Sequence, residues 1–133
     1  MLPLQILRVG QLVLLIVPTE MTTMAGRRMR DHMKALLVEN GVIGAEGVVI
    51  IAGLANGYAD YTTTFEEYQI QRYEGGSTIF GPHQLNVGLV FCSLSVSFYI
   101  GRIYHSFQCI FFLSLLSVSF SAALALMSKL HRH

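Results

Sequence analysis

The strongest constraint on the fold is the order of three segments: a short apolar run, a helical pattern and a second short apolar run. The first run covers residues 11–17 (QLVLLIV) and ends at Pro18, and the second covers residues 47–52 (GVVIIA) and is followed by a glycine. Short runs rich in Val, Leu and Ile are typical of strands that are buried on both faces. Between them, residues 22–39 carry apolar side chains at helical spacing. The order strand, helix, strand predicts an α/β fold built on a right-handed βαβ unit with parallel strands.

The helix predicted over residues 22–39 has a recognisable signal at each end. Thr22 or Thr23 can cap its N-terminus, because a hydroxyl accepts hydrogen bonds from the free N–H groups of the first turn. Asn40 and Gly41 form a typical stop at its C-terminus. We therefore expect one amphipathic helix between the two strands.

A second helix is predicted over residues 64–74. Thr64 and Glu67 have the spacing of a capping box, in which each side chain bonds the backbone N–H of the other residue. Two glycines at residues 75–76 follow and are expected to end the helix.

The first apolar run also admits a second interpretation, as the core of a signal peptide preceded by Met1 and Arg8. Three features count against that alternative. The basic residue comes late, Gln5 and Gln11 interrupt the apolar core, and no cleavage site of small residues follows. We therefore favour a buried strand over residues 11–17.

Composition divides the chain into a head, residues 1–88, and a tail, residues 89–133. All the acidic residues lie between Glu20 and Glu74, so the tail contains none. Only 13% of all residues are charged and 53% are hydrophobic, whereas soluble domains usually carry about twice that charged share. The net charge is +1, so composition offers no electrostatic argument for a nucleic-acid partner.

Candidate site residues follow the two predicted strands. Ligands of parallel α/β sheets bind beyond the carboxyl ends of the strands. Glu20 comes just after the first strand, and Tyr58 and Tyr61 come shortly after the second. If the strands are neighbours, these side chains converge on one site. Taken singly, a carboxylate such as Glu20 more often only stabilises the first turn of a helix, and a tyrosine more often packs in a core.

Three consecutive stretches of the head resemble the neutral ceramidase family. They read LPLQILRVGQLVLLIVP, VPTEMTTMAGRRMRD and GVVIIAGLANGYADYTTTFEEYQIQRYEGGSTIFGPH. The resemblance holds in register over residues 2–86. It implies an internal fragment of the catalytic domain of a zinc-dependent amidohydrolase, which cleaves ceramide into sphingosine and a fatty acid. The whole chain is then expected to consist of this α/β fragment followed by an apolar, helical tail.

The resemblance also implies roles for three residues. The family's single catalytic Zn²⁺ is held by two histidines, one glutamate and one tyrosine. The glutamate of the Pro-x-Glu-x-Thr-Thr-Met block corresponds to Glu20. The tyrosine corresponds to Tyr61, the second of the pair before the Thr-Thr-x-Glu-Glu-Tyr block, rather than to Tyr58. A further family tyrosine, which lies near the scissile carbonyl, corresponds to Tyr73 in the Gln-Arg-Tyr-Glu-Gly block and can donate to a developing oxyanion.

Other parts of the family site have no counterpart in the matched stretches. The histidine ligands and a serine near the scissile amide belong to earlier family blocks, and His32 and His83 match no ligand motif. Two ligands are expected to bind zinc weakly, so the chain is predicted to be inactive alone. The implied partners are the ceramide substrate and a membrane surface. The implied location is the secretory pathway, membrane-associated or extracellular, and the oligomeric state is not indicated.

The tail contains a candidate transmembrane segment over residues 107–127. No charged residue lies between Arg102 and Lys129, and such a stretch is long enough to span a bilayer. Three interpretations compete: a membrane anchor, a buried or disordered tail on a truncated product, or translated non-coding sequence past a splice boundary. The abrupt end of the resemblance before Leu89 favours the third. The rival to a ceramidase fragment is a non-catalytic, membrane-anchored α/β remnant that binds lipid or a partner.

Overall fold

The computed structural model describes residues 3–105. Its main sheet has the strand order β1 (Gln5–Val9), β2 (Leu12–Ile16) and β4 (Val48–Ala52). Strands β2 and β4 are parallel, with Leu14 paired to Ile50. The two strands predicted from the apolar runs are therefore confirmed, and so is their parallel pairing.

Strand β1 was not predicted from the sequence. It pairs with β2 in antiparallel orientation, with Val9 opposite Leu12. The turn between the two strands contains Gly10, whose φ of 60° lies in the left-handed region that favours glycine. The sequence signal that could have revealed this hairpin is Gly10, which separates residues 5–9 from the apolar run over residues 11–17.

Helix α1 (Thr23–Glu39) connects β2 to β4 and confirms the predicted helix. Thr22 is the N-cap, because its hydroxyl accepts a hydrogen bond of 3.3 Å from the backbone N–H of Ala25. The C-cap is Asn40, and Gly41 follows with a φ of 66°. Both end signals read from the sequence therefore act as expected.

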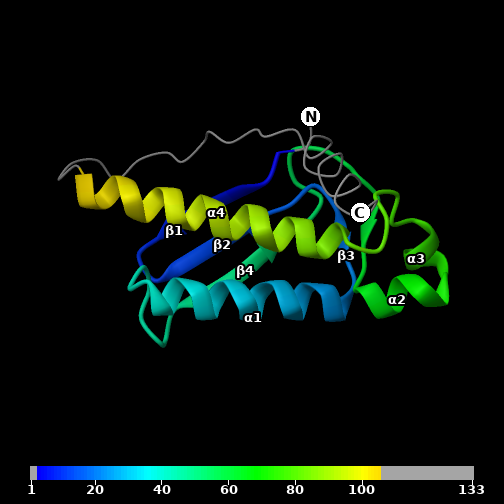
Figure 1. Cartoon of the computed structure of the whole chain (residues 1–133), viewed down its shortest axis with the longest axis horizontal. Helices are drawn as coiled ribbons and strands as arrows, with labels where there is room; N and C mark the ends of the chain where they lie inside the picture. Colours follow the sequence, from blue (N-terminus) through cyan, green and yellow to red (C-terminus); the bar gives the residue numbers. More distant parts are fainter. Residues whose placement is uncertain (1–2, 106–133) are drawn as a thin grey trace, which may run out of the picture.

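The hydrophobic core lies between one face of the main sheet and the helices α1 and α4 (Gln84–His105). Figure 1 shows these two helices side by side on the same side of the sheet. Every second residue of β2 points into the core, as the pleat of a strand requires. The buried core residues of these elements include Val13, Leu15, Ala25, Met29, Met33, Leu37, Val49, Leu85, Cys92 and Val96.

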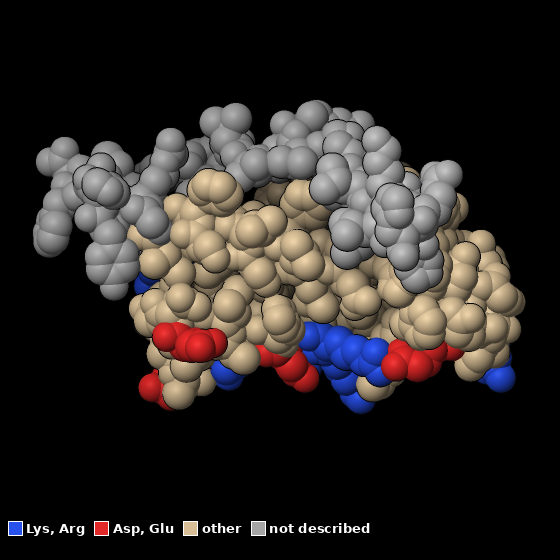
Figure 2. Space-filling model, in the orientation of Figure 1, with Lys and Arg blue, Asp and Glu red and all other residues tan. Residues whose placement is uncertain are grey.

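The other face of the main sheet is apolar and is left open by the described residues. Val9, Val48 and Ile50 are each about half exposed or more, and Val48 and Ile50 lie on either side of the buried Val49. The charged side chains gather elsewhere: Figure 2 shows them along the side of the molecule where α1 lies. Both faces of the sheet are therefore apolar, but among the described residues only one of them is covered by helices.

The prediction of a single helix over residues 64–74 is wrong, because the chain forms two short helices there. Helix α2 (Phe65–Ile70) ends at Gln71, whose φ of 53° and ψ of 38° are left-handed, and α3 (Tyr73–Gly76) follows. Gly75 explains the break. A Cβ atom on Gly75 would lie 3.1 Å from the backbone oxygen of Glu67 in α2, so this glycine lets α3 fold back closely onto α2.

Helix α4 runs across the predicted division between head and tail at residues 88–89. Val87 lies before that division and Cys92 and Val96 lie after it, and all three are buried. Within residues 3–105 no helix has both the length and the apolar character that a bilayer span requires. The candidate transmembrane segment over residues 107–127, and the helical character predicted for that part of the tail, lie outside the described residues.

Candidate functional site

The candidate site is built on a two-stranded ribbon just beyond the carboxyl ends of β2 and β4. Strand β3 (Glu20–Met21) pairs in parallel with β5 (Tyr61–Thr62), and Glu20 is the direct partner of Tyr61. The backbone N–H of Glu20 donates to the carbonyl of Asp60 at 2.9 Å. This pairing places two of the predicted site residues side by side on one face of the ribbon.

Tyr58 joins them from the loop between β4 and β5. Its hydroxyl donates to Glu20 Oε1 at 2.9 Å. Hydrogen bonding to the Glu20 carboxylate, followed by burial and by the carboxylate's charge, raises the pKa of Tyr58 to about 12. The same causes in the same order raise the pKa of Tyr61 to about 12. One carboxylate therefore faces two phenols, as the positions of Glu20, Tyr58 and Tyr61 after the strands led us to expect.

Tyr73 reaches the site because α3 is fastened to β5. The backbone N–H of Tyr61 donates to the carbonyl of Ser77 at 3.2 Å. The buried hydroxyls of Thr63 and Thr78 lie 3.1 Å apart. As a result the ring of Tyr73 meets the ring of Tyr61 edge-on, with centroids 5.5 Å apart and planes at 80°. Tyr73 is 74% exposed, so its hydroxyl is open to a ligand.

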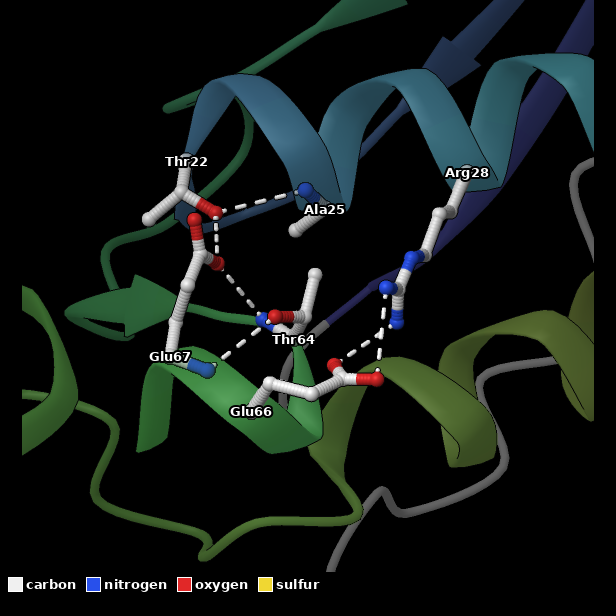
Figure 3. Close-up of polar contacts among 6 residues, drawn as sticks. All are labelled: Thr22, Ala25, Arg28, Thr64, Glu66 and Glu67. Atoms are coloured by element: carbon white, nitrogen blue, oxygen red, sulfur yellow. Dashed lines mark hydrogen bonds and ion pairs between the residues drawn. The ribbon is translucent and has the colours of Figure 1, made fainter. Parts of the chain in front are cut away.

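A polar link joins the start of α1 to the start of α2 beside the ribbon (Figure 3). The Thr22 hydroxyl donates to Glu67 Oε2 at 2.6 Å, and the backbone N–H of Thr64 donates to the same oxygen at 2.9 Å. The predicted capping box of Thr64 and Glu67 is confirmed, since the N–H of Glu67 also donates to the Thr64 hydroxyl. The hydrogen bonds from Thr22 and Thr64 lower the pKa of Glu67, although burial, its largest single influence, acts in the opposite direction.

An exposed ion pair extends the same link. Both terminal nitrogens of Arg28 donate to the Glu66 carboxylate, at 2.8 and 3.3 Å (Figure 3). The bond from Arg28 is the main cause that lowers the pKa of Glu66. Both side chains of the pair are about half exposed or more, and such ion pairs contribute little to stability. Arg28 is therefore a partner of α2 rather than one more solvated residue on the helix surface.

The structure brings Glu20, Tyr58, Tyr61 and Tyr73 together, and it shows a hydrogen bond from Tyr58 to Glu20 that the sequence did not reveal. The two histidines of the head lie elsewhere. The ring of His83 lies 5.4 Å from that of Phe65, and that of His32 contacts the hydroxyl of Ser93. Within residues 3–105 no cluster of three or more His, Cys, Asp or Glu side chains is placed to hold a metal.

The donor atoms at the ribbon fit a divalent cation in part. Carboxylate oxygens are common zinc ligands, and a phenol becomes a ligand when a metal takes the place of its proton. Glu20 has the carboxylate, and Tyr58 and Tyr61 direct their phenols toward it. Two neighbouring strands thus supply two kinds of oxygen donor to the same point.

Comparison with known proteins gives a consistent family match. Residues 1–89 match the family described as neutral/alkaline non-lysosomal ceramidase, N-terminal. Neutral ceramidase 3 of Arabidopsis thaliana is 64% identical over 85 residues, which are 64% of this chain and 12% of that protein. The neutral ceramidase of Oryza sativa subsp. japonica is 58% identical over 86 residues, which are 64% of this chain and 11% of that protein. The chain thus matches only a small part of the length of these relatives.

Solved structures show the same relationship. The crystal structure of neutral ceramidase from Pseudomonas aeruginosa is similar with a TM-score of 0.68 and 35% identity, covering 90% of this chain and 17% of that one. A ceramidase described as complexed with C2 is similar with a TM-score of 0.64 and 34% identity, covering 86% of this chain and 17% of that one. The mixed α/β arrangement described above therefore also occurs within larger proteins.

Proposed function

Because this chain belongs to the neutral/alkaline non-lysosomal ceramidase family, we propose that residues 1–88 form part of the active site of a ceramide amidohydrolase. The observation that carries the proposal is the convergence of Glu20, Tyr61 and Tyr73 beyond the carboxyl ends of β2 and β4. This is where α/β folds of this kind bind their ligands. The reaction is hydrolysis of the amide of ceramide to sphingosine and a fatty acid.

Glu20 and Tyr61 are the residues that hold a single Zn²⁺ in this proposal. A bound zinc ion supplies positive charge that polarises a carbonyl and lowers the pKa of a water molecule. Tyr58 keeps the Glu20 carboxylate oriented through the hydrogen bond of 2.9 Å between them. A catalytic zinc usually has three protein ligands, and these residues supply two. We therefore propose that the chain alone binds zinc weakly and does not turn over ceramide.

Tyr73 has the geometry of a hydrogen-bond donor to the substrate. It is largely exposed, and its ring is held against Tyr61 rather than against the core. A phenol hydroxyl in this position can donate to the amide oxygen of the substrate while negative charge builds up there. It thus favours the transition state over the bound substrate.

The surface around the ribbon fits an apolar substrate. Leu54, Phe65 and Ile79 are each about half exposed. Leu54 follows β4, Phe65 begins α2 and Ile79 follows α3. A lipid such as ceramide, presented at a membrane surface, would cover these side chains. We also propose that this chain belongs to the location that its resemblance to neutral ceramidases implies, which is the secretory pathway, membrane-associated or extracellular.

A graft tests the proposal with this chain's own residues. Residues 1–89 replace the segment that they match in neutral ceramidase 3 of Arabidopsis thaliana, which is 64% identical to them. We expect the graft to hydrolyse ceramide and to contain zinc, and the Glu20→Gln graft to lose both. Glu46→Gln, at an exposed position outside the site, is the matched control.

The outcomes separate the parts of the proposal. Zinc retained at full stoichiometry in the Glu20→Gln graft would overturn the assignment of Glu20 as a ligand. A Tyr73→Phe graft is expected to keep its zinc and to lose turnover, mainly through kcat. Robust ceramide hydrolysis by the present chain alone would overturn the proposal that it supplies only part of the site.

A further inference from the structure

The ribbon that carries Glu20 and Tyr61 has little stability of its own. Strands β3 and β5 are two residues long, so their mutual hydrogen bonds are few. Side chains alternate along a strand. Glu20 and Tyr61 therefore share one face, and Met21 and Thr62 share the face behind it. The geometry of the site depends on what holds this rear face.

Gln84, the first residue of α4, lies directly behind the ribbon and is only 2% exposed. Its side-chain nitrogen donates to the backbone oxygen of Tyr61 at 2.9 Å and to the hydroxyl of Thr62 at 2.7 Å. Its side-chain oxygen accepts from the backbone N–H of Phe80 at 3.4 Å. Both hydrogens of the amide group are thus used to hold β5.

The link continues from β5 to the residue before Glu20. The hydroxyl of Thr62 donates to that of Thr19 at 2.9 Å, and both threonines are buried. One chain of hydrogen bonds therefore runs from Gln84 through Thr62 in β5 to Thr19, the residue that precedes β3. Buried links of this kind are costly to break, because each broken bond leaves a polar group without water or a partner.

The surroundings of the link are apolar. A cavity of about 30 Å³ lies beside it, lined mostly by apolar side chains that include Val17, Met29 and Leu85. No buried side-chain nitrogen or oxygen among the described residues lacks a hydrogen-bond partner. The link is therefore fully satisfied in its native geometry.

We propose that Gln84 is a positioning residue, which holds Glu20 and Tyr61 in register by donating to Tyr61 and Thr62 from behind the ribbon. The proposal rests on the zinc site proposed above, since the register matters for function only if both residues bind one ion. Hydrogen-bond partners of ligand side chains change metal affinity by about 10- to 100-fold when they are replaced. Gln84 bonds to the backbone of Tyr61 rather than to its phenol, so we expect an effect at the lower end of that range.

The test uses the full chain and the variant Gln84→Met, which keeps the side-chain volume but removes both donors. Amide hydrogen exchange is measured at Glu20 and Thr22. The N–H of Glu20 donates to the carbonyl of Asp60, and the N–H of Thr22 donates to the carbonyl of Thr62 in β5. We expect exchange there to become about tenfold faster or more, with the exchange of Met33 in the core unchanged. Gln69→Met, at an exposed position of α2, is the matched control and should leave all three amides unchanged.

Zinc titration by calorimetry provides the second measurement. We expect Gln84→Met to raise the Kd for Zn²⁺ about tenfold, as Glu20→Gln should raise it further. Exchange like that of the unmodified chain in Gln84→Met would overturn the proposal. So would faster exchange with an unchanged zinc Kd, because Gln84 would then support the fold but not the site.

Two outcomes need a separate arm. If Glu20→Gln binds zinc like the unmodified chain, the proposed zinc site fails, and the exchange data alone decide whether Gln84 holds the ribbon. If Gln84→Met also loses protection at Met33, Thr62→Val takes its place. That variant removes the hydroxyl that joins Gln84 to Thr19 and leaves the bond from Gln84 to the backbone oxygen of Tyr61 in place. Faster exchange at Glu20 therefore supports the proposal, and unchanged exchange overturns it.

Discussion

Replacing Glu67 with glutamine should lower the free energy of unfolding by about 1–2 kcal/mol at neutral pH. One oxygen of Glu67 accepts two hydrogen bonds, from the Thr22 hydroxyl at 2.6 Å and from the Thr64 N–H at 2.9 Å. A bond to a charged group contributes about 1.5–3 kcal/mol and a neutral one about 0.5–1.5 kcal/mol, so an amide loses about 1 kcal/mol for each. Because these two hydrogen bonds are only partly buried, solvent reduces this loss of unfolding free energy somewhat.

The loss should depend on pH, with a sign that follows from the lowered pKa of Glu67. A carboxyl whose pKa is lower in the folded state stabilises the fold fully above its unfolded pKa, which is about 4.3. This contribution disappears as the pH falls through the folded pKa. Glutamine does not titrate, so the difference between the unmodified chain and Glu67→Gln should shrink in acid.

Urea unfolding of both proteins at pH 7 and near pH 3 measures this difference. Glu46→Gln, at an exposed position, should change stability by less than about 0.5 kcal/mol at either pH. A loss below about 0.3 kcal/mol for Glu67→Gln at pH 7 would refute the energetic role of the link. A loss of the same size at both pH values would refute the role of the carboxylate's charge.

Two further predictions concern the core and are also measured by urea unfolding. Met33→Ala should lower the free energy of unfolding by about 2–5 kcal/mol, because Met33 is fully buried. Ile50→Ala, on the open face of the sheet and 46% exposed, should lower it by about 1 kcal/mol or less. Equal losses would contradict this placement of the core. Gly47→Ala should cost about 1–3 kcal/mol, since the added methyl group would lie 2.9 Å from the backbone oxygen of Gly44. An alanine variant as stable as the unmodified chain would show that this tight turn can relax.

The main α/β unit could be predicted from the sequence because its signals are local. The apolar runs of β2 and β4, the cap at Thr22 and the stop at Asn40 each act within a few residues. Strand β1 and the break at Gln71 could not be predicted in the same way. Their conformations depend on a pairing partner and on the close approach of α3 to α2.

The candidate site shows the same division. Order along the chain placed Glu20, Tyr58 and Tyr61 after parallel strands, and the family resemblance assigned roles to Glu20, Tyr61 and Tyr73. Neither source showed that the phenol of Tyr58 bonds to Glu20, or that Gln84 supports the ribbon from behind.

The sequence by itself thus determined the strands β2 and β4, the helix α1 between them and the ends at which these two strands meet. Only the tertiary structure decided how the site is held together. Its contacts join residues as far apart as Thr22 and Glu67, which are separated by 45 positions in the chain. Such contacts leave no periodic pattern in the sequence, because a single glutamine or threonine makes its hydrogen bonds only after the packing of α4 and the ribbon has placed it.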